Sequence, residues 1–220
     1  SHAVSAENVR MGKKNHIFPH AVIGESPQDL KYAGEYSTVV IGDETDIHEF
    51  ATIHRATGEN CETRIGSHNM LQAYTHVAHN SNFGDYIVVS SFSGVAGHVT
   101  VEDHAVIGAM SGVHQFVKIG AFAMIGGMSK IVQDVCPFVI ADGNPARVVG
   151  LNAVGIARNK IPAESKSALK KAYRLIFRSG LKLNDAIQEM EQELPSTPEI
   201  EHLLRFLRNC DRGLCRTRDR

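Results

Sequence analysis

The 220-residue chain carries 23 Lys/Arg against 24 Asp/Glu, is 43% hydrophobic and contains no Trp. These values are typical of one large soluble domain or of a domain with an appendage. The chain has no apolar run long enough to cross a bilayer, so we expect no membrane insertion. Charge is unevenly distributed, because residues 1–150 carry 9 Lys/Arg against 15 Asp/Glu and residues 151–220 carry 14 against 9. The basic C-terminal part favours an acidic or phosphorylated partner.

The four cysteines, Cys61, Cys136, Cys210 and Cys215, show no paired C-x-x-C spacing. A chain of this size does not need disulfides to be stable, so we interpret them as reduced thiols of a cytoplasmic protein.

An apolar residue recurs at every sixth position. Of the 21 positions taken in steps of six from Met11 to Ile131, only Asp29, Glu35 and Glu59 are not apolar, and the series is unbroken from Ile65 onward. Neither a helical period of 3.6 nor a strand period of 2 produces this pattern. A hexapeptide repeat does, and it predicts a parallel β-helix whose stacked coils bury a shared aliphatic axis.

Two polar interruptions, at 25–37 and 55–64, predict loops that project from the coils, and long loops on a rigid scaffold usually carry function. We expect the β-helix to cover residues 1–140, with coils of three hexapeptides, and to begin at or before the first residue given.

Residues 141–220 are predicted to form a linker and a small α-helical domain. A turn-rich exit at 141–146 precedes an amphipathic helix over 163–179 that Gly180 ends. Asn184 is the expected N-cap of a second helix, and Thr197-Pro198 is the expected start of a third. We expect this three-helix region to pack and to bind partners.

Four histidines carry the expected chemistry. With three hexapeptides to a coil, His76, His79, His98 and His114 lie along one edge of the prism, and Gly97 lies one coil above His79. A neutral imidazole is suited to take a proton from a sugar hydroxyl, and a nearby backbone N–H can stabilise the oxyanion of acyl transfer. Three histidines could also bind zinc, as in a hydratase. No G-x-S-x-G, P-loop or dinucleotide motif is present.

Five ordered segments resemble the UDP-N-acetylglucosamine O-acyltransferases, the family that begins lipid A biosynthesis. They read QDLKYAGE at 28–35, TIHR at 52–55, HVAH at 76–79, AGH at 96–98 and VHQF at 113–116. The likeness covers nearly the whole chain and continues through QDV at 133–135, GN at 143–144 and RSG at 178–180.

The resemblance implies a left-handed parallel β-helix, although the general crossover rule favours the right hand. It also implies a homotrimer with active sites between subunits. We expect His54 on a different edge of the prism from the histidine cluster, and in a trimer it could reach the active site of a neighbouring subunit. The implied reaction moves an (R)-3-hydroxyacyl group from acyl carrier protein to the 3-hydroxyl of UDP-N-acetylglucosamine. It needs no cofactor and no metal, and we expect no nucleic-acid partner.

The same resemblance assigns roles to individual residues, with His79 as general base and the Gly97 N–H as oxyanion donor. Asp29 and Lys31 contact the sugar nucleotide, and Gly127 limits the acyl length, where a glycine leaves room for a longer chain. The remaining assigned residues line the site, border the acyl groove or hold the nucleotide: His76, Gln115, His98, His114, Asn152 and Arg158.

The chain departs from the family pattern at three residues. Asn80 replaces the Asp that usually follows the base, Val154 replaces a Glu, and Asn159 replaces the second of two Arg. Against the same pattern, we expect two or more N-terminal coils to be missing. An amide at position 80 cannot stabilise an imidazolium electrostatically. The alternatives therefore include N-acylation of a UDP-amino sugar, either a 3-amino analogue or UDP-3-acyl-glucosamine, and an inactive paralogue.

Overall fold

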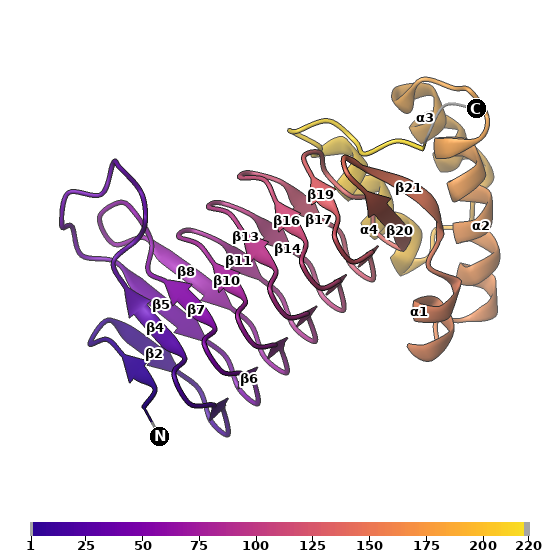
Figure 1. Cartoon of the computed structure of the whole chain (residues 1–220). Helices are drawn as coiled ribbons and strands as arrows, with labels where there is room; N and C mark the ends of the chain where they lie inside the picture. The colour runs from indigo at the N-terminus through magenta and orange to yellow at the C-terminus, as the bar shows by residue number, and fades with distance from the viewer. Residues whose placement is uncertain (1, 218–220) are drawn as a thin grey trace.

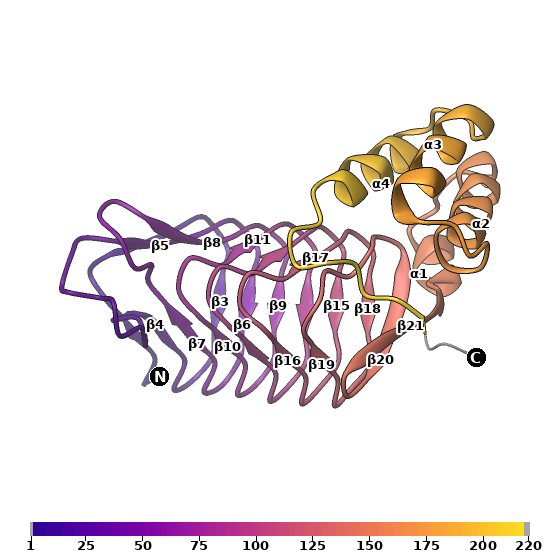
Figure 2. The same ribbon diagram turned by 90° about the horizontal axis from the view of Figure 1, so that it is seen from above.

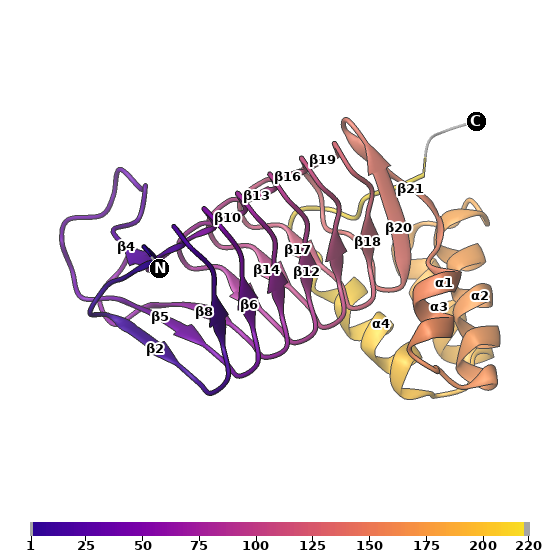
Figure 3. The ribbon, with the colours of Figure 1, turned by 60° about the horizontal axis from the view of Figure 1, so that its bottom comes forward.

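The structure is a computed structural model, and it describes residues 2–217. The chain forms an elongated three-sided prism of short parallel strands, with a group of helices at the end opposite the N-terminus (Figure 1). Each side of the prism is one sheet whose strands are parallel except for the final β20–β21 pair, and each coil contributes one strand to each sheet. The stacking of successive coils is seen in Figure 3.

The first sheet has seven strands in the order β1-β4-β7-β10-β13-β16-β19. Their bounds are β1 Val4–Ser5, β4 Val22–Glu25, β7 Thr52–His54, β10 His76–Val77, β13 Gly94–Val95, β16 Gly112–Val113 and β19 Lys130–Ile131. The second sheet has six strands: β2 Val9–Met11, β5 Thr38–Ile41, β8 Glu62–Ile65, β11 Asn82–Phe83, β14 Thr100–Val101 and β17 Lys118–Ile119.

The third sheet has eight strands and carries an antiparallel pair at one end. Its strands are β3 His16–Ile17, β6 Asp46–Ile47, β9 Met70–Leu71, β12 Val88–Val89, β15 Val106–Ile107, β18 Met124–Ile125, β20 Val139–Gly143 and β21 Ala146–Leu151. The turn-rich exit expected at 141–146 is the tip of the β20–β21 hairpin: residues 141–143 and 146 are paired strand residues, and only 144–145 form the turn. The inward residues of the hairpin continue the core.

The aliphatic residues of the repeat form the core. In the third sheet Val89, Ile107 and Ile125 stack in register on successive coils, and each is 0% exposed. Neighbouring coils therefore supply one another's hydrogen bonds and apolar contacts, as the six-residue period predicts.

Each corner of the prism carries a residue with positive φ, and most of these residues are not glycine. Tyr74, Asn80 and Tyr86, at the three corners of one coil, have φ of 62°, 58° and 58°. This conformation costs a non-glycine residue about 1–2 kcal/mol. Aromatic rings stack along the corners, for example Tyr86 on His104 at 4.8 Å between centroids, and such pairs contribute about 0.5–1.5 kcal/mol each. Stacking thus offsets the backbone strain.

The β-helix is left-handed, as the family resemblance implied. The right-handed crossover rule rests on the twist of strands. Most strands here are two residues long and accumulate little twist, so the cause of that rule is nearly absent.

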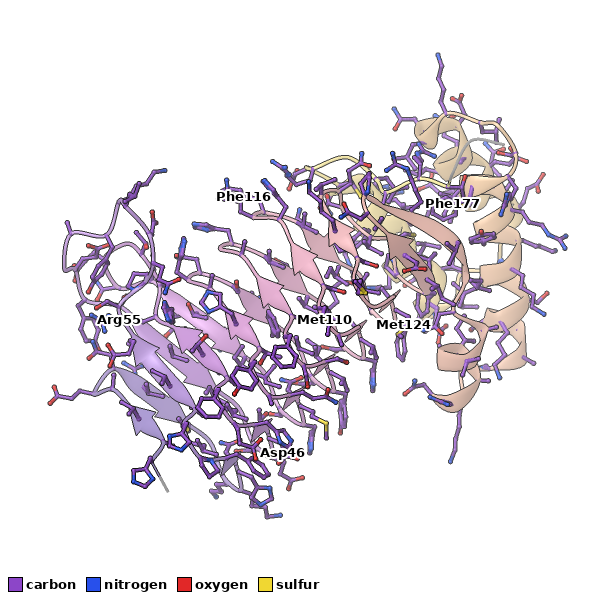
Figure 4. All side chains as sticks on the ribbon, in the orientation of Figure 1. Asp46, Arg55, Met110, Phe116, Met124 and Phe177 are labelled. Carbon is purple, nitrogen blue, oxygen red and sulfur yellow. The ribbon has the colours of Figure 1, made fainter. Side chains whose placement is uncertain are left out.

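The two polar interruptions are loops that project near the N-terminal end (Figure 1). Regular coils pair residues that are three hexapeptides apart, as in His76 with Gly94. Across the first loop the offset is five hexapeptides, because Val22 pairs with Thr52. Across the second loop it is four, because Thr52 pairs with His76. Arg55 ties the loops together, because its guanidinium donates to the Gly24 carbonyl, the Ser26 hydroxyl and the Tyr32 hydroxyl. It lies at their base in Figure 4.

In the described part of the chain, up to residue 217, four helices follow the hairpin: α1 Ala153–Arg158, α2 Ala163–Phe177, α3 Leu183–Glu193 and α4 Pro198–Arg208. The sequence predicted three helices and missed α1, which has only 6 residues. Thr197 caps α4 through the Ile200 N–H, as expected. The N-cap of α3 is Lys182 and not Asn184, because the helix begins early enough for Leu183 to pack against the core. No helix within residues 2–217 is long and apolar enough to span a membrane.

The segment after α4 runs back along the β-helix (yellow in Figure 2) and is anchored by Asp134. Asp134 is 0% exposed, and its carboxylate accepts from the backbone N–H groups of Lys118 and Arg212 at 2.8 and 3.1 Å. Burial raises the pKa of this carboxyl, and the two N–H donors oppose that shift. The C-terminal segment is thereby joined to the last coils.

Replacing Ile107 by Ala should lower the free energy of unfolding by about 2–5 kcal/mol, because it opens a cavity in the stacked core. The conservative Ile107→Val should cost only about 0.5–1.5 kcal/mol. Urea denaturation followed by circular dichroism measures both. If both variants lost equally little free energy of unfolding, the stacked aliphatic core would not be the source of the stability.

Candidate active site

A pocket of about 550 Å³ lies on the outer face of the first sheet, at the corner between the first and second sheets. We call it the histidine pocket. Its volume lies in the range of small-molecule sites. It is lined by Gln28, His76, Ala78, His79, Gly94, Val95, Ala96, Gly97, Gly112, Val113, His114, Gln115, Lys130, Ile131 and Val132.

The floor of the histidine pocket follows from the strand register. His76, Gly94, Gly112 and Lys130 are paired in succession along the first sheet, so their side-chain positions form one outward column. A Cβ at either Gly94 or Gly112 would meet no atom within 4 Å. The two glycines therefore leave an open strip that begins at His76 and ends at the Lys130 side chain. A strip of this kind can accommodate an extended apolar chain.

His79 and Gly97 are in direct contact, as the sequence predicted from their spacing. A Cβ on Gly97 would lie 2.6 Å from both Nε2 and Cε1 of His79. Within the described residues the Gly97 N–H donates to no acceptor. A free backbone donor therefore sits beside a free imidazole nitrogen.

Asn80 fixes the tautomer of His79. The Asn80 Oδ1 accepts from the Thr57 backbone N–H at 2.9 Å, and the Asn80 Nδ2 donates to the Thr57 carbonyl at 2.9 Å. Because a backbone N–H can only donate, these two bonds determine which way the amide points. Nδ1 of His79, 2.8 Å from that Oδ1, must then carry its proton, which leaves the lone pair on Nε2.

The first loop brings a carboxylate to the other side of the ring. Asp29 Oδ2 is 3.8 Å from His79 Nε2, and the two side chains are 18% and 15% exposed. The Lys31 backbone N–H donates to Asp29 Oδ1 at 3.0 Å, and this bond is the main cause that lowers the pKa of Asp29. Asp29 is therefore an anion at neutral pH.

His54 lies in the same cluster, which corrects the expectation that it occupies a different edge. Its strand β7 pairs with β10, and the His54 and His76 rings meet edge-on at 5.0 Å between centroids. The expectation was wrong because it counted regular coils of three hexapeptides across the second loop, where the true offset is four hexapeptides.

The imidazoles around His79 are kept neutral. Burial lowers the pKa of His76 to about 4, and it also lowers the pKa of His54 and of His98. The Thr52 hydroxyl lies 2.7 Å from His76 Nδ1, whereas the buried Nδ1 of His54 has no partner within the described chain. His98 stacks on Phe116 and meets the His79 ring edge-on.

His114 and Gln115 also line the histidine pocket, one coil above Ala96 and Gly97. The C-terminal segment reaches this rim, since Arg212 Nη2 lies 3.2 Å from His114 Nδ1. Phe116, which follows strand β16, and Met110, which precedes it, lie on opposite edges of the first sheet (Figure 4).

Three of the expected site residues are not part of this cluster. Asn152 caps α1, and its amide donates to the Phe122 carbonyl at the corner between the second and third sheets. Arg158 is exposed in the last turn of α1. Gly127 is at the third corner, where its Cβ would lie 3.3 Å from the Ala109 carbonyl. None of the three lines the histidine pocket.

The expected site set did not include Lys130, Gln28 and Thr57. Lys130 was predictable, because it lies one regular coil beyond Gly112 in the same column. Gln28 and Thr57 belong to the projecting loops, where no repeat register fixes a position. Their contacts with the site come from the folded loops alone.

Within residues 2–217, no group of three or more His, Cys, Asp or Glu side chains is arranged to hold a metal ion. The cluster instead offers an unprotonated imidazole nitrogen, a free backbone N–H and an open apolar strip. This combination suits transfer of an acyl group to an oxygen or nitrogen nucleophile.

Comparison with known proteins agrees with that chemistry. Residues 134–215 match a family model described as UDP N-acetylglucosamine O-acyltransferase, domain 2. The chain is 53% identical over 212 residues to a protein of Rippkaea orientalis, covering 96% of this chain and 76% of that protein. It is 50% identical to one of Fusobacterium nucleatum, covering 98% and 84%. Both relatives are named acyl-[acyl-carrier-protein]–UDP-N-acetylglucosamine O-acyltransferase.

Solved structures give the same relationship. A UDP-N-acetylglucosamine acyltransferase of Bacteroides fragilis superposes with a TM-score of 0.95 at 39% identity, covering 98% of this chain and 85% of that one. The Moraxella catarrhalis UDP-N-acetylglucosamine O-acyltransferase gives 0.93 at 44% identity, covering 98% and 84%.

The fold and the histidine pocket thus define an acyltransferase built from hexapeptide repeats. More narrowly, the chain belongs to the acyl-[acyl-carrier-protein]–UDP-N-acetylglucosamine O-acyltransferase family.

Replacing Gly97 by Ala should lower kcat by about 10²-fold, since the added Cβ displaces a ring that Asn80 holds in place, and misplacement by about 1 Å can cost that much. Gly150→Ala is the matched control, because a Cβ at Gly150 would meet no atom within 4 Å. Steady-state acyl transfer measures the effect, and circular dichroism checks that both variants fold. Undiminished kcat in Gly97→Ala would mean that the contact is unimportant.

Proposed function

We propose that this chain transfers an (R)-3-hydroxyacyl group from acyl carrier protein to the 3-hydroxyl of UDP-N-acetylglucosamine, the first step of lipid A biosynthesis. The observation that carries the proposal is the contact of the His79 ring with Gly97, whose N–H is free, beside the open glycine strip. The names of the relatives supply the donor and acceptor substrates.

In the proposed mechanism His79 Nε2 removes the proton of the sugar hydroxyl as the oxygen attacks the thioester carbon. The carbonyl oxygen becomes an oxyanion, which accepts a hydrogen bond from the Gly97 N–H. Collapse of this intermediate breaks the carbon–sulfur bond, and the departing thiolate takes the proton from His79. The base is regenerated, the ester is formed, and the carrier leaves as a free thiol.

The other residues of the pocket are proposed to bind substrate. Asp29 and Lys31 stand where the first loop reaches His79, and we assign them to the sugar nucleotide together with His76 and Gln115. We assign the glycine strip to the acyl chain, together with His114, which lines the same pocket, and His98, which meets the His79 ring. Burial keeps His54 and His76 neutral, so these two side chains place no positive charge beside His79.

We propose that the active unit is a homotrimer with sites between subunits. Asn152, Arg158 and Gly127 lie on other sides of the prism from His79, so one chain cannot bring them to one site. The corner between the third and first sheets carries a row of exposed apolar side chains, a feature that marks interaction surfaces. The row consists of Phe50 at 43%, Tyr74 at 49%, Phe92 at 57%, Met110 at 59% and Met128 at 72% exposed.

We further propose that the protein acts in the cytoplasm. Within residues 2–217, Cys61, Cys136, Cys210 and Cys215 are all free thiols, which persist in a reducing compartment.

Replacing His79 by Ala should lower kcat by about 10²–10⁴-fold, the usual contribution of a general base. His104→Ala is the control, because His104 lies at a different corner of the prism, stacked between the Tyr86 and Phe122 rings, and does not line the histidine pocket. The assay follows transfer from 3-hydroxyacyl carrier protein to UDP-N-acetylglucosamine. Full activity of His79→Ala would contradict the mechanism, and transfer only to a 3-amino analogue would change the acceptor.

Two inactive variants should restore each other if sites are shared. His79→Ala and Arg158→Ala, co-expressed in equal amounts, should give mixed trimers with about one quarter of wild-type activity, because random assembly leaves that fraction of interfaces intact. Each variant alone provides the baseline. No recovery in trimers shown by mass spectrometry to be mixed would contradict a site that combines His79 of one subunit with Arg158 of its neighbour.

A further inference from the structure

Asn80 is suited to its place for a structural reason that an aspartate could not satisfy. Its Nδ2 donates to the Thr57 carbonyl, and its Oδ1 accepts from the Thr57 N–H and from His79 Nδ1. The Asn80 backbone N–H also donates to the Thr63 hydroxyl at 2.8 Å. A carboxylate at position 80 would place an oxygen against the Thr57 carbonyl with no proton between them. The second loop therefore favours an amide at position 80 over a carboxylate.

This arrangement leaves the Nδ1 side of the ring without an anion. Asn80 can orient His79 and fix its tautomer, yet its neutral amide gives an imidazolium no charge stabilisation. The reaction passes through a protonated His79, so the missing charge has to come from elsewhere.

We propose that Asp29 supplies it: the carboxylate that stabilises protonated His79 is the one on the first loop, on the side of the ring opposite Asn80. This inference rests on the proposed function and deepens it, since Asp29 is given an electrostatic role in addition to substrate contact. Asp29 Oδ2 lies 3.8 Å from Nε2, beyond direct hydrogen bonding and close enough for charge interaction. Both side chains are mostly shielded from solvent, which limits screening.

Asp29 remains ionised and takes no proton in the reaction. The Lys31 N–H holds it in place, and the loop that carries it is tied to the coils through Arg55. The other titratable groups that act on this region are Lys31, His54, His76 and His98. Burial keeps the three histidines neutral. Among the ion pairs of residues 2–217, Asp29 is the carboxylate that pairs with His79.

The test begins with Asp29→Asn, which keeps the shape and removes the charge. We expect kcat to fall by about 10²-fold, less than the roughly 10⁴-fold loss typical when the tautomer is also disturbed. We also expect the acid limb of the pH–kcat/KM profile to move to lower pH. Asp46→Asn is the matched control, because it breaks an Asp–His pair, Asp46 Oδ1 to His16 Nδ1, on another side of the prism.

A second variant separates charge from substrate binding. Asn80→Asp places a carboxylate at Nδ1, so in the Asp29→Asn background it should raise kcat at least about tenfold, as expected if either carboxylate can stabilise the same imidazolium. Asn80→Asp alone, with Asp29 intact, should lower the melting temperature and should not raise kcat. An Asp29→Asn variant that changes only KM, or a double variant without recovery of kcat, would overturn the proposal.

A measurement without turnover distinguishes this inference from the proposed function. The His79 imidazole signal, assigned by its loss in His79→Gln, is titrated by NMR in the whole chain. In Asp29→Asn the midpoint should move to lower pH, because the charged ring loses its anion. An unchanged midpoint would refute the role of Asp29, even if the protein proves to acylate a different acceptor. Absence of transfer to UDP-N-acetylglucosamine, with a shifted midpoint, would refute the substrate alone.

Discussion

The structure depends on the stacking of one aliphatic residue per hexapeptide on its equivalent in the next coil. No two-residue strand is stable alone, and each coil obtains both its hydrogen bonds and its apolar contacts from its neighbours. Because Val77, Val95 and Val113 point inward in strict register, the residues beside them must project outward in equally strict columns. The catalytic geometry is therefore a consequence of core packing.

Departures from the regular coil create the site. The two loops lengthen their coils from three hexapeptides to five and to four, so each adds a whole number of hexapeptides and the phase of the repeat survives. The three positions that break the apolar series, Asp29, Glu35 and Glu59, are all in these loops. In the loops a side chain at the sixth position need not face the core, so polar side chains can reach the histidine pocket. Glu35 accepts the Gly58 N–H and joins one loop to the other.

The electrostatics of the site follow from where water is excluded. Burial lowers the pKa of His54 and of His76 and so keeps both neutral, and the Lys31 N–H keeps Asp29 charged. His79 stands between these two environments, with a neutral amide behind it and a carboxylate near its reactive nitrogen. The substitution of Asn at position 80 is explained by the Thr57 backbone, which offers one donor and one acceptor to the same side chain.

The amino-acid sequence by itself determined the β-helix, its coil length, both loops and the edge shared by His76, His79, Gly97, His98 and His114. These features follow from a period of six, which depends only on which residues can be buried. The structure alone decided the place of His54, the N-cap of α3, the β20–β21 hairpin and the contacts of Asp29 and Asn80. Loop residues have no repeat to fix their position, and a helix begins where packing of a residue such as Leu183 requires it. Their placement depends on contacts between segments far apart in the chain, and such contacts exist only once the coils have stacked.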